Sequence, residues 1–232
     1  MRLCAKIAGT MILGLMTATA AFAVTYEVTI ENEIPGGLET GQPFSPPVAV
    51  VHDAGYSQWV PGGEASPGLE LVAREGDPSV LEMEALDSPN VYDVVIGNDG
   101  PFLDTAVFTI EGEPGQLFSV AWMLGRTNDL FSGLYDVILP KEGSIEFDPD
   151  VWDSGTEENT GLIEHLGFYG FPNAGPDEDA LISMIDSYTV HNDPDYGELS
   201  WDFPPNAHVT IRVEEPTAAA ETTWGSVKTT YR

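Results

Sequence analysis

Apolar and polar residues alternate along much of this chain. The first such run is VTYEVTIENEI (24–34), in which β-branched and aromatic residues fill almost every second position. A period of two indicates a strand with one buried face. The other runs that predict strands are 48–51, 91–97, two runs within 105–130 that flank the turn EPGQ, 135–140, 143–153 and 207–216.

Two segments between the early strands have a helical pattern instead. Ser66 followed by Pro67 is typical of a helix start, and Gly76 is typical of a helix end. Between them, Leu69, Val72 and Ala73 fall on one helical face. A second short helix is predicted to begin near Asp77-Pro78 and to carry Val80, Leu81 and Leu86.

Strands at this spacing, with few helices, favour an all-β fold: an antiparallel β-sandwich with one or two short helices between the early strands. The segment 160–205 is rich in Gly, Pro, Asn and Asp, and only ALISMIDSYTV (180–190) within it is predicted to be a strand or helix. Connections between strands that have no function of their own are shorter than this segment, so we predict a functional or mobile loop there. The pattern indicates no internal repeat and no second domain.

The two ends of the chain are predicted to lie outside the folded domain. Residues 1–23 have a short basic start, an apolar stretch and the small-residue sequence AFA, which together indicate a signal peptide cleaved near Ala23. The mature protein would be secreted or periplasmic, without a membrane span. Cys4 is the only cysteine and would leave with the signal, so we expect no disulfide. The domain is predicted over 24–215, and 216–232 form a linker and tail.

The chain is strongly acidic, with a formal net charge of −30 from 38 acidic and 8 basic residues. This charge excludes electrostatic binding to nucleic acid, because phosphates would be repelled. No basic patch is present for an anionic membrane surface. Two explanations of the acidity stay open. Acidic residues keep a protein soluble in a salty exterior, where repulsion is screened, and some of them could instead converge on a divalent cation.

One acidic segment, VWDSGTEENTG (151–161), has the composition of a cation-binding loop. Gly155 permits a sharp turn that folds Glu157 back toward Asp153. Asn128 and Asp129 follow a predicted strand and would meet this loop at the same end of a sandwich. Calcium prefers six to eight oxygen ligands from carboxylates, carbonyls and water. We therefore predict a Ca²⁺ site with the side-chain ligands Asp129, Asp153, Glu157 and Asn128.

The alternative interpretation is that these side chains only stabilise turns. Asn and Asp often accept a hydrogen bond from the backbone two residues further on, so Asp153 and Asn128 would cap turns without any ion. The neighbouring Trp152 is predicted to be a core residue, because it points to the opposite face of its strand from Asp153.

Five segments together resemble the spondin N-terminal domain family, which occurs in F-spondin, in mindin and in many exported bacterial proteins. They are PFSPPVAVVHDAGY (43–56), GEASPGLELVAREGDPSVLEMEAL (63–86), TNDLFSG (127–133), VWDSGTEENTG (151–161) and AHVTIRVE (207–214). The resemblance implies an antiparallel β-sandwich with calcium held by loop carboxylates at one end, and a role in adhesion or matrix binding. The chain departs from animal members in lacking disulfides and in having Ala121 where they carry an acid before tryptophan.

Motifs of common enzymes are absent from the sequence. There is no GxSxG or HExxH segment, and His52, His165, His191 and His208 are isolated from one another. This spacing disfavours zinc, and His52 beside Asp53 is predicted to be a structural histidine. Paired carboxylates would suit glycoside hydrolysis, but in a chain this acidic some pair is expected by composition alone.

These observations predict a monomeric, non-enzymatic, calcium-binding module that binds an extracellular protein or glycan. Two alternatives stay open: an extracellular polysaccharide hydrolase that uses paired carboxylates, and a structural surface protein without a ligand site.

Overall fold

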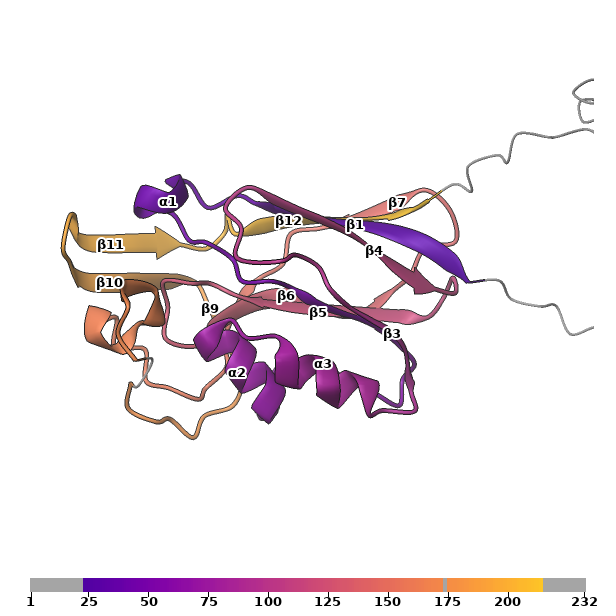
Figure 1. Ribbon diagram of the computed structural model, residues 1–232, viewed down its shortest axis with the longest axis horizontal. Helices are drawn as coiled ribbons and strands as arrows, with labels where there is room; N and C mark the ends of the chain where they lie inside the picture. The colour runs from indigo at the N-terminus through magenta and orange to yellow at the C-terminus, as the bar shows by residue number, and fades with distance from the viewer. Residues whose placement is uncertain (1–22, 173–174, 215–232) are drawn as a thin grey trace, which may run out of the picture.

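The computed structural model describes residues 23–172 and 175–214. The predicted signal peptide, apart from Ala23, and the predicted tail lie outside these residues. The described chain is a sandwich of two antiparallel sheets, with a hairpin at one end and a helical layer on one outer face (Figure 1). The predicted all-β sandwich is therefore confirmed. None of the described helices is both long and apolar enough to span a bilayer.

The first sheet contains both ends of the described domain. Its strands are, in spatial order, β4 (Thr105–Gly112), β1 (Val24–Asn32), β12 (Ala207–Val213) and β7 (Ser144–Phe147). Strand β1 pairs along its length with β12, from Tyr26 opposite Val213 to Asn32 opposite Ala207. The alternation read from the sequence is visible here, because the apolar residues of β1 are buried and the intervening polar residues are more exposed.

The second sheet has six strands and carries the acidic loop at one end. In spatial order they are β3 (Val91–Ile96), β2 (Val48–His52), β5 (Leu117–Met123), β6 (Leu130–Ile138), β8 (Val151–Asp153) and β9 (Ser183–Ile185). Its inner face packs on the first sheet around the fully buried side chains Tyr26, Ile30, Phe118 and Trp122.

The segment 143–153, predicted as one strand, is in fact two strands in different sheets. Strand β7 pairs with β12, and after Pro149 the chain crosses over so that β8 pairs with β6. Proline lacks the N–H that a continuous ladder needs, which explains the break. Asn206 donates to the Pro149 carbonyl at 3.1 Å and Ser132 to the Asp150 carbonyl at 2.9 Å, so the crossing is fixed by side chains.

The outer face of the six-stranded sheet is covered by two helices, α2 (Pro67–Glu75) and α3 (Ser79–Leu86) (Figure 1). The predicted signals of α2 are confirmed: Ser66 caps the helix by accepting from the Leu69 N–H, and Gly76 ends it in a left-handed conformation. The second predicted helix is α3, which carries Val80, Leu81 and Leu86; Leu81 is buried, whereas Leu86 is 64% exposed. A further short helix, α1 (Gly37–Thr40), was not predicted.

Trp152 is buried, as predicted, but in a different layer. It belongs to a second core between the six-stranded sheet and the helices, where its ring lies 5.4 Å from that of Trp59. The prediction assumed that the only buried face of the sheet is the sandwich interior. The helices give this sheet a second buried face, and Ala121 also lies in this core.

The segment 160–205 is far more structured than predicted. Besides β9 it contains two short 3-10 helices, Ile163–His165 and Gly167–Tyr169, and a hairpin of β10 (Ser187–Asp193) and β11 (Gly197–Asp202). The hairpin alternates buried and exposed positions, with Val190 and Trp201 facing the core. Its short strands and many turn residues concealed this pattern in the sequence.

Ser66 joins the two helices, which generates a stability prediction. Its hydroxyl donates to Glu84 of α3 at 2.6 Å while it caps α2. Ser66→Ala should lower the free energy of unfolding by about 1–2 kcal/mol, because an N-cap and an interhelical hydrogen bond are both lost. Thermal melting should detect a decrease of several degrees. Ser57→Ala, at an exposed loop serine, is the matched control, and an equal decrease in both variants would contradict this role.

Candidate functional site

The pairing of β6 with β8 brings the two predicted acidic segments together. Leu130 lies opposite Asp153, so residues 128–129 before β6 and residues 154–157 after β8 emerge at the same end of the sheet. This meeting was predicted from the sequence. Asn128, Asp129 and Glu157 are completely buried, and Asp153 is partly buried.

Asp129 binds the loop after β8 through a single carboxylate oxygen. Its Oδ2 accepts hydrogen bonds from the backbone N–H groups of Thr156 and Glu157, at 2.8 and 2.9 Å. It also accepts from the hydroxyls of Ser154 and Thr156, at 2.8 and 2.9 Å. Four donors on one oxygen stabilise the charge of a buried carboxylate and fix the loop conformation.

The other oxygen of the same carboxylate is in a different situation. Asp129 Oδ1 is buried and has no hydrogen-bond partner among the described residues. A buried carboxylate oxygen without a donor is costly, and such atoms in folded proteins call for an explanation such as a bound ion or water.

Glu157 is paired with an arginine that the sequence analysis did not consider. Arg74 of α2 places Nη2 2.5 Å from Glu157 Oε1, and it also bonds Glu70 one turn earlier at 2.7 Å. Burial raises the pKa of Glu157, while the positive charge of Arg74 and the amide of Asn128 favour its ionised form. Arg74 thus supplies positive charge at the site.

Asp153 lies at the end of β8 and closes the turn that follows. Its Oδ1 accepts the Gly155 N–H at 2.7 Å, and its Oδ2 accepts from the amide of Asn159. Burial, together with repulsion by the charge of Asp129, raises the pKa of Asp153 to about 6. Asp153 therefore caps a turn, as the alternative interpretation expected, and its charge is unfavourable in the absence of a cation.

Asn128 is also engaged in hydrogen bonds. Its Oδ1 accepts from the hydroxyl of Tyr188 at 2.5 Å and from the Gly161 N–H at 3.4 Å. Direct coordination of a metal by this oxygen would replace one of these bonds. A Cβ added at Gly175 would lie 3.0 Å from Glu157 Oε2 and 3.1 Å from Asn128 Nδ2, so only glycine leaves these side chains undisturbed.

The structure therefore brings the four predicted ligands to one end of the six-stranded sheet. In the described residues, however, no group of three or more Asp, Glu, His or Cys side chains is arranged as a metal site. Arg74, Ser154 and Tyr188 also contact these residues and were not predicted from the sequence. Ser154 and Thr156 belonged to the recognised loop and could have been included as donors, whereas no local signal links Arg74 or Tyr188 to it.

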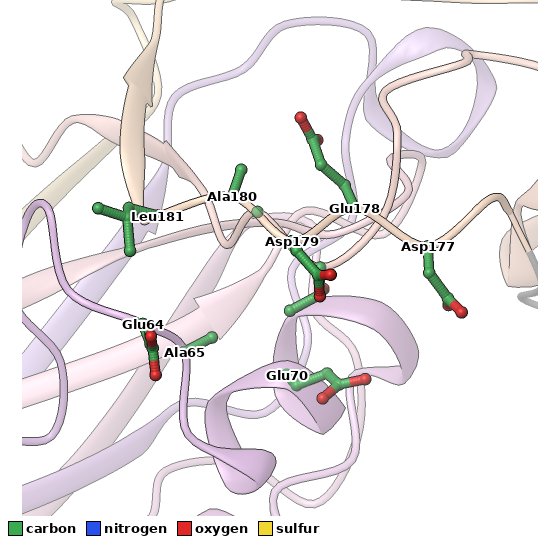
Figure 2. A pocket seen from close by; sticks show the side chains of 10 residues that line it. Glu64, Ala65, Glu70, Asp177, Glu178, Asp179, Ala180 and Leu181 are labelled. Carbon is green, nitrogen blue, oxygen red and sulfur yellow. The ribbon is translucent and has the colours of Figure 1, made fainter.

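An acidic cleft of about 580 Å³ borders this site (Figure 2). One wall contains Gly155 and Thr156 of the acidic loop, and another contains Glu64 and Glu70 at the start of α2. The segment 177–181 forms the remaining side and carries Asp177, Glu178 and Asp179. Among the described residues, its lining contains no aromatic side chain on which a sugar ring would stack. A cleft lined by one sign of charge raises the local concentration of cations.

His52 forms a second buried polar group at the opposite end of the six-stranded sheet. Its Nε2 lies 2.9 Å from Ser119 Oγ and its Nδ1 2.9 Å from the Asp53 carbonyl. Both side chains are fully buried, and Ser119 Oγ also accepts the N–H of Asp136 at a β-bulge. These hydrogen bonds stabilise the irregular strand pairing, and they are consistent with the prediction that His52 is a structural histidine.

A scan against models of protein families and a search of curated proteins find no match to this chain. The resemblance to spondin N-terminal domains thus stays a prediction that rests on the five segments.

The ion pair between Arg74 and Glu157 yields a mutational prediction. Arg74→Met should lower the free energy of unfolding by about 2–4 kcal/mol, because it leaves the carboxylate of Glu157 buried without its cation. Arg74→Met/Glu157→Gln should recover most of this loss, which a double-mutant cycle from urea unfolding would measure. Arg212→Met removes an exposed ion pair with Glu27 and should cost at most about 1 kcal/mol. Equal losses at both arginines would contradict the role of Arg74.

The raised pKa of Asp153 predicts how stability changes with pH. In the unfolded chain this carboxyl ionises near its ordinary value of 3.8, and in the folded protein near 6. Between these values the folded state binds more protons, so the contribution of Asp153 to stability falls as pH rises through this window. Without divalent cations, Asp153→Asn should melt higher than the parent above pH 6, and the difference should vanish below about pH 4.

The control for this measurement is Asp150→Asn, which removes the same charge from an exposed side chain of the neighbouring segment. A parallel gain in both variants would mean that general charge repulsion, rather than the environment of Asp153, is responsible.

Proposed function

We propose that the protein is a calcium-stabilised binding module of spondin type, with a role in adhesion or extracellular surface binding. The observation that carries this proposal is the buried oxygen Asp129 Oδ1, which has no donor and belongs to a completely buried carboxylate. It lies in a group with Asp153 and Glu157, whose pKa values are both raised by burial and by the charge of Asp129. A cation at this place would relieve both effects.

The residues fit a hard divalent cation better than other metals. The donor set consists of carboxylate and amide oxygens, with hydroxyls and backbone carbonyls nearby, and calcium accepts such irregular oxygen shells. Asp129 and Asp153 would be the principal ligands. Glu157 would be shared between the ion and Arg74, and Asn128 would join if its oxygen released Tyr188 or Gly161. The acidic cleft beside the site would attract the ion.

The proposed role of the ion is structural. It would join the segment before β6 to the loop after β8 and neutralise part of their repulsion. A loop ordered before binding loses less conformational entropy when a partner docks, and this strengthens the complex. The five spondin-like segments support the same type of module, and the absence of enzyme motifs in the sequence supports a non-catalytic role.

Thermal melting of residues 24–232 tests the proposal. Excess chelator is compared with calcium and with magnesium at equal ionic strength, because salt alone stabilises a protein of this charge. Calcium at 100 times its Kd should add about 2.7 kcal/mol, or roughly 5–10 °C, and magnesium clearly less. No rise, or an equal rise with magnesium, would contradict a calcium site.

Variants then locate the ion. The calcium-induced rise should be lost in Asp129→Asn and strongly reduced in Asp153→Asn, and it should persist in the exposed control Asp150→Asn. If Asp129→Asn does not fold, Asp153→Asn still tests the location of the ion, because Asp153→Asn should fold stably in chelator. A full calcium response in Asp153→Asn would remove this residue from the site.

A further inference from the structure

An apolar hollow of about 400 Å³ opens at the same end of the sandwich as the acidic loop. Its floor is formed by core residues, including Phe44, which is fully buried, and Met123, which is 5% exposed. Its rim is formed by Leu38 of α1 and by Phe168, which are 64% and 37% exposed. The remaining apolar lining residues are Pro43, Pro101 and Leu103.

Glycines keep this hollow open. A Cβ at Gly76 would lie 3.0 Å from Ser45 and 3.6 Å from Met123 Sδ, and a Cβ at Gly125 would lie 3.0 Å from Pro43. Gly76 also has a φ of +66°, which favours glycine. The volume falls in the range of sites that accept a large side chain or a small ligand.

The charges around the hollow limit what can enter it. Exposed carboxylates lie on or next to the lining, at Glu39, Glu75, Asp77 and Asp104. The two nearby arginines already have partners within the protein. Arg74 is bound to Glu70 and Glu157, and Arg126 is buried, stacked 4.0 Å from the Phe168 ring and 3.6 Å from Asp193.

The other basic residues in the described part of the chain, Lys141 and Arg212, lie at the opposite end of the sandwich, where β12 ends. An anionic ligand would therefore meet a ring of carboxylates with no spare cation. The complementary partner is basic around an apolar centre.

We propose that this hollow is the docking site for a large apolar side chain of a protein partner, flanked on that partner by lysine or arginine. The apolar side chain would fill the hollow, and its basic neighbours would face the carboxylates of the rim. Central apolar anchors with a polar rim are the usual form of protein interfaces. This inference goes beyond the calcium site and does not require it, although Arg74 contributes to both places.

Short peptides can test this proposal by NMR on the ¹⁵N-labelled chain. The probe is acetyl-Lys-Gly-Trp-Gly-Lys-amide, compared with Lys-Gly-Ser-Gly-Lys, which keeps the charge, and Glu-Gly-Trp-Gly-Glu, which keeps the anchor. The first peptide should shift the amides of Leu38, Gly76, Leu103, Gly125 and Phe168, and the others should shift them much less. Equal shifts with the Ser peptide, shifts confined to the acidic cleft, or no shifts at millimolar peptide would overturn the proposal.

Matched variants identify the contact. Leu38→Ser should weaken binding of the Trp peptide about 5- to 20-fold, because it removes apolar area from the rim. Leu86→Ser, which is also 64% exposed but does not line the hollow, should bind like the parent. Equal affinity of Leu38→Ser and the parent would overturn the assignment to the hollow.

Other occupants would give different results. Shifts of the same amides on raising the protein concentration would indicate a second copy of the chain. Shifts caused only by a synthetic peptide of residues 216–232 would indicate the end of this chain. Shifts with neutral cyclohexanol but not with the Trp peptide would indicate a small-molecule site. Each of these results would overturn the proposal of a basic protein partner. Every measurement is made both with chelator and with calcium, so this test is separate from the test of the calcium site.

Discussion

The carboxylate of Asp129 organises the end of the sandwich where the candidate site lies. One of its oxygens accepts hydrogen bonds from two backbone N–H groups and two hydroxyls of the loop after β8, and these four bonds fix the conformation of the loop. Burying a carboxylate is unfavourable unless its hydrogen-bonding and its charge are both compensated. The four donors satisfy the hydrogen-bonding of Oδ2 only, and Oδ1 remains without a donor.

The neighbouring charges respond to the same constraint. Asp153 ends β8 and Glu157 lies in the loop that Asp129 holds, and burial together with the charge of Asp129 raises the pKa of each. Arg74 reaches in from the helical layer to neutralise Glu157. The helical layer therefore does more than cover the sheet, because its Arg74 provides the positive charge that pairs with Glu157. In a protein with few basic residues, two of the described arginines serve inside the fold as internal counter-ions.

Local signals were sufficient for α2, for several strands and for part of the site. Ser66, Pro67 and Gly76 specify the two ends of α2, and the alternation in β1 specifies a half-buried strand. The meeting of Asp129 with the acidic loop was predictable because both follow strands of a sandwich. The contact of Arg74 with Glu157 was not, because it depends on how the helices lie on the sheet. The crossing at Pro149 and the second core around Trp152 were missed for the same reason: they are properties of the layers and not of any segment.

The pairing of β1 with β12 also sets the direction in which the molecule would carry a mechanical load. The start of β1 and the end of β12 lie together (Figure 1). The acidic loop and the residues that line the apolar hollow lie at the other end of the strands. Force applied between the two chain ends would peel β1 from β12 one hydrogen-bonded pair at a time. Force applied between a bound partner and a chain end would instead run along the strands, so that the ladder bonds, which are perpendicular to them, are loaded together in shear. We therefore expect the fold to yield more readily to tension across the two ends of the domain than to tension along its strands.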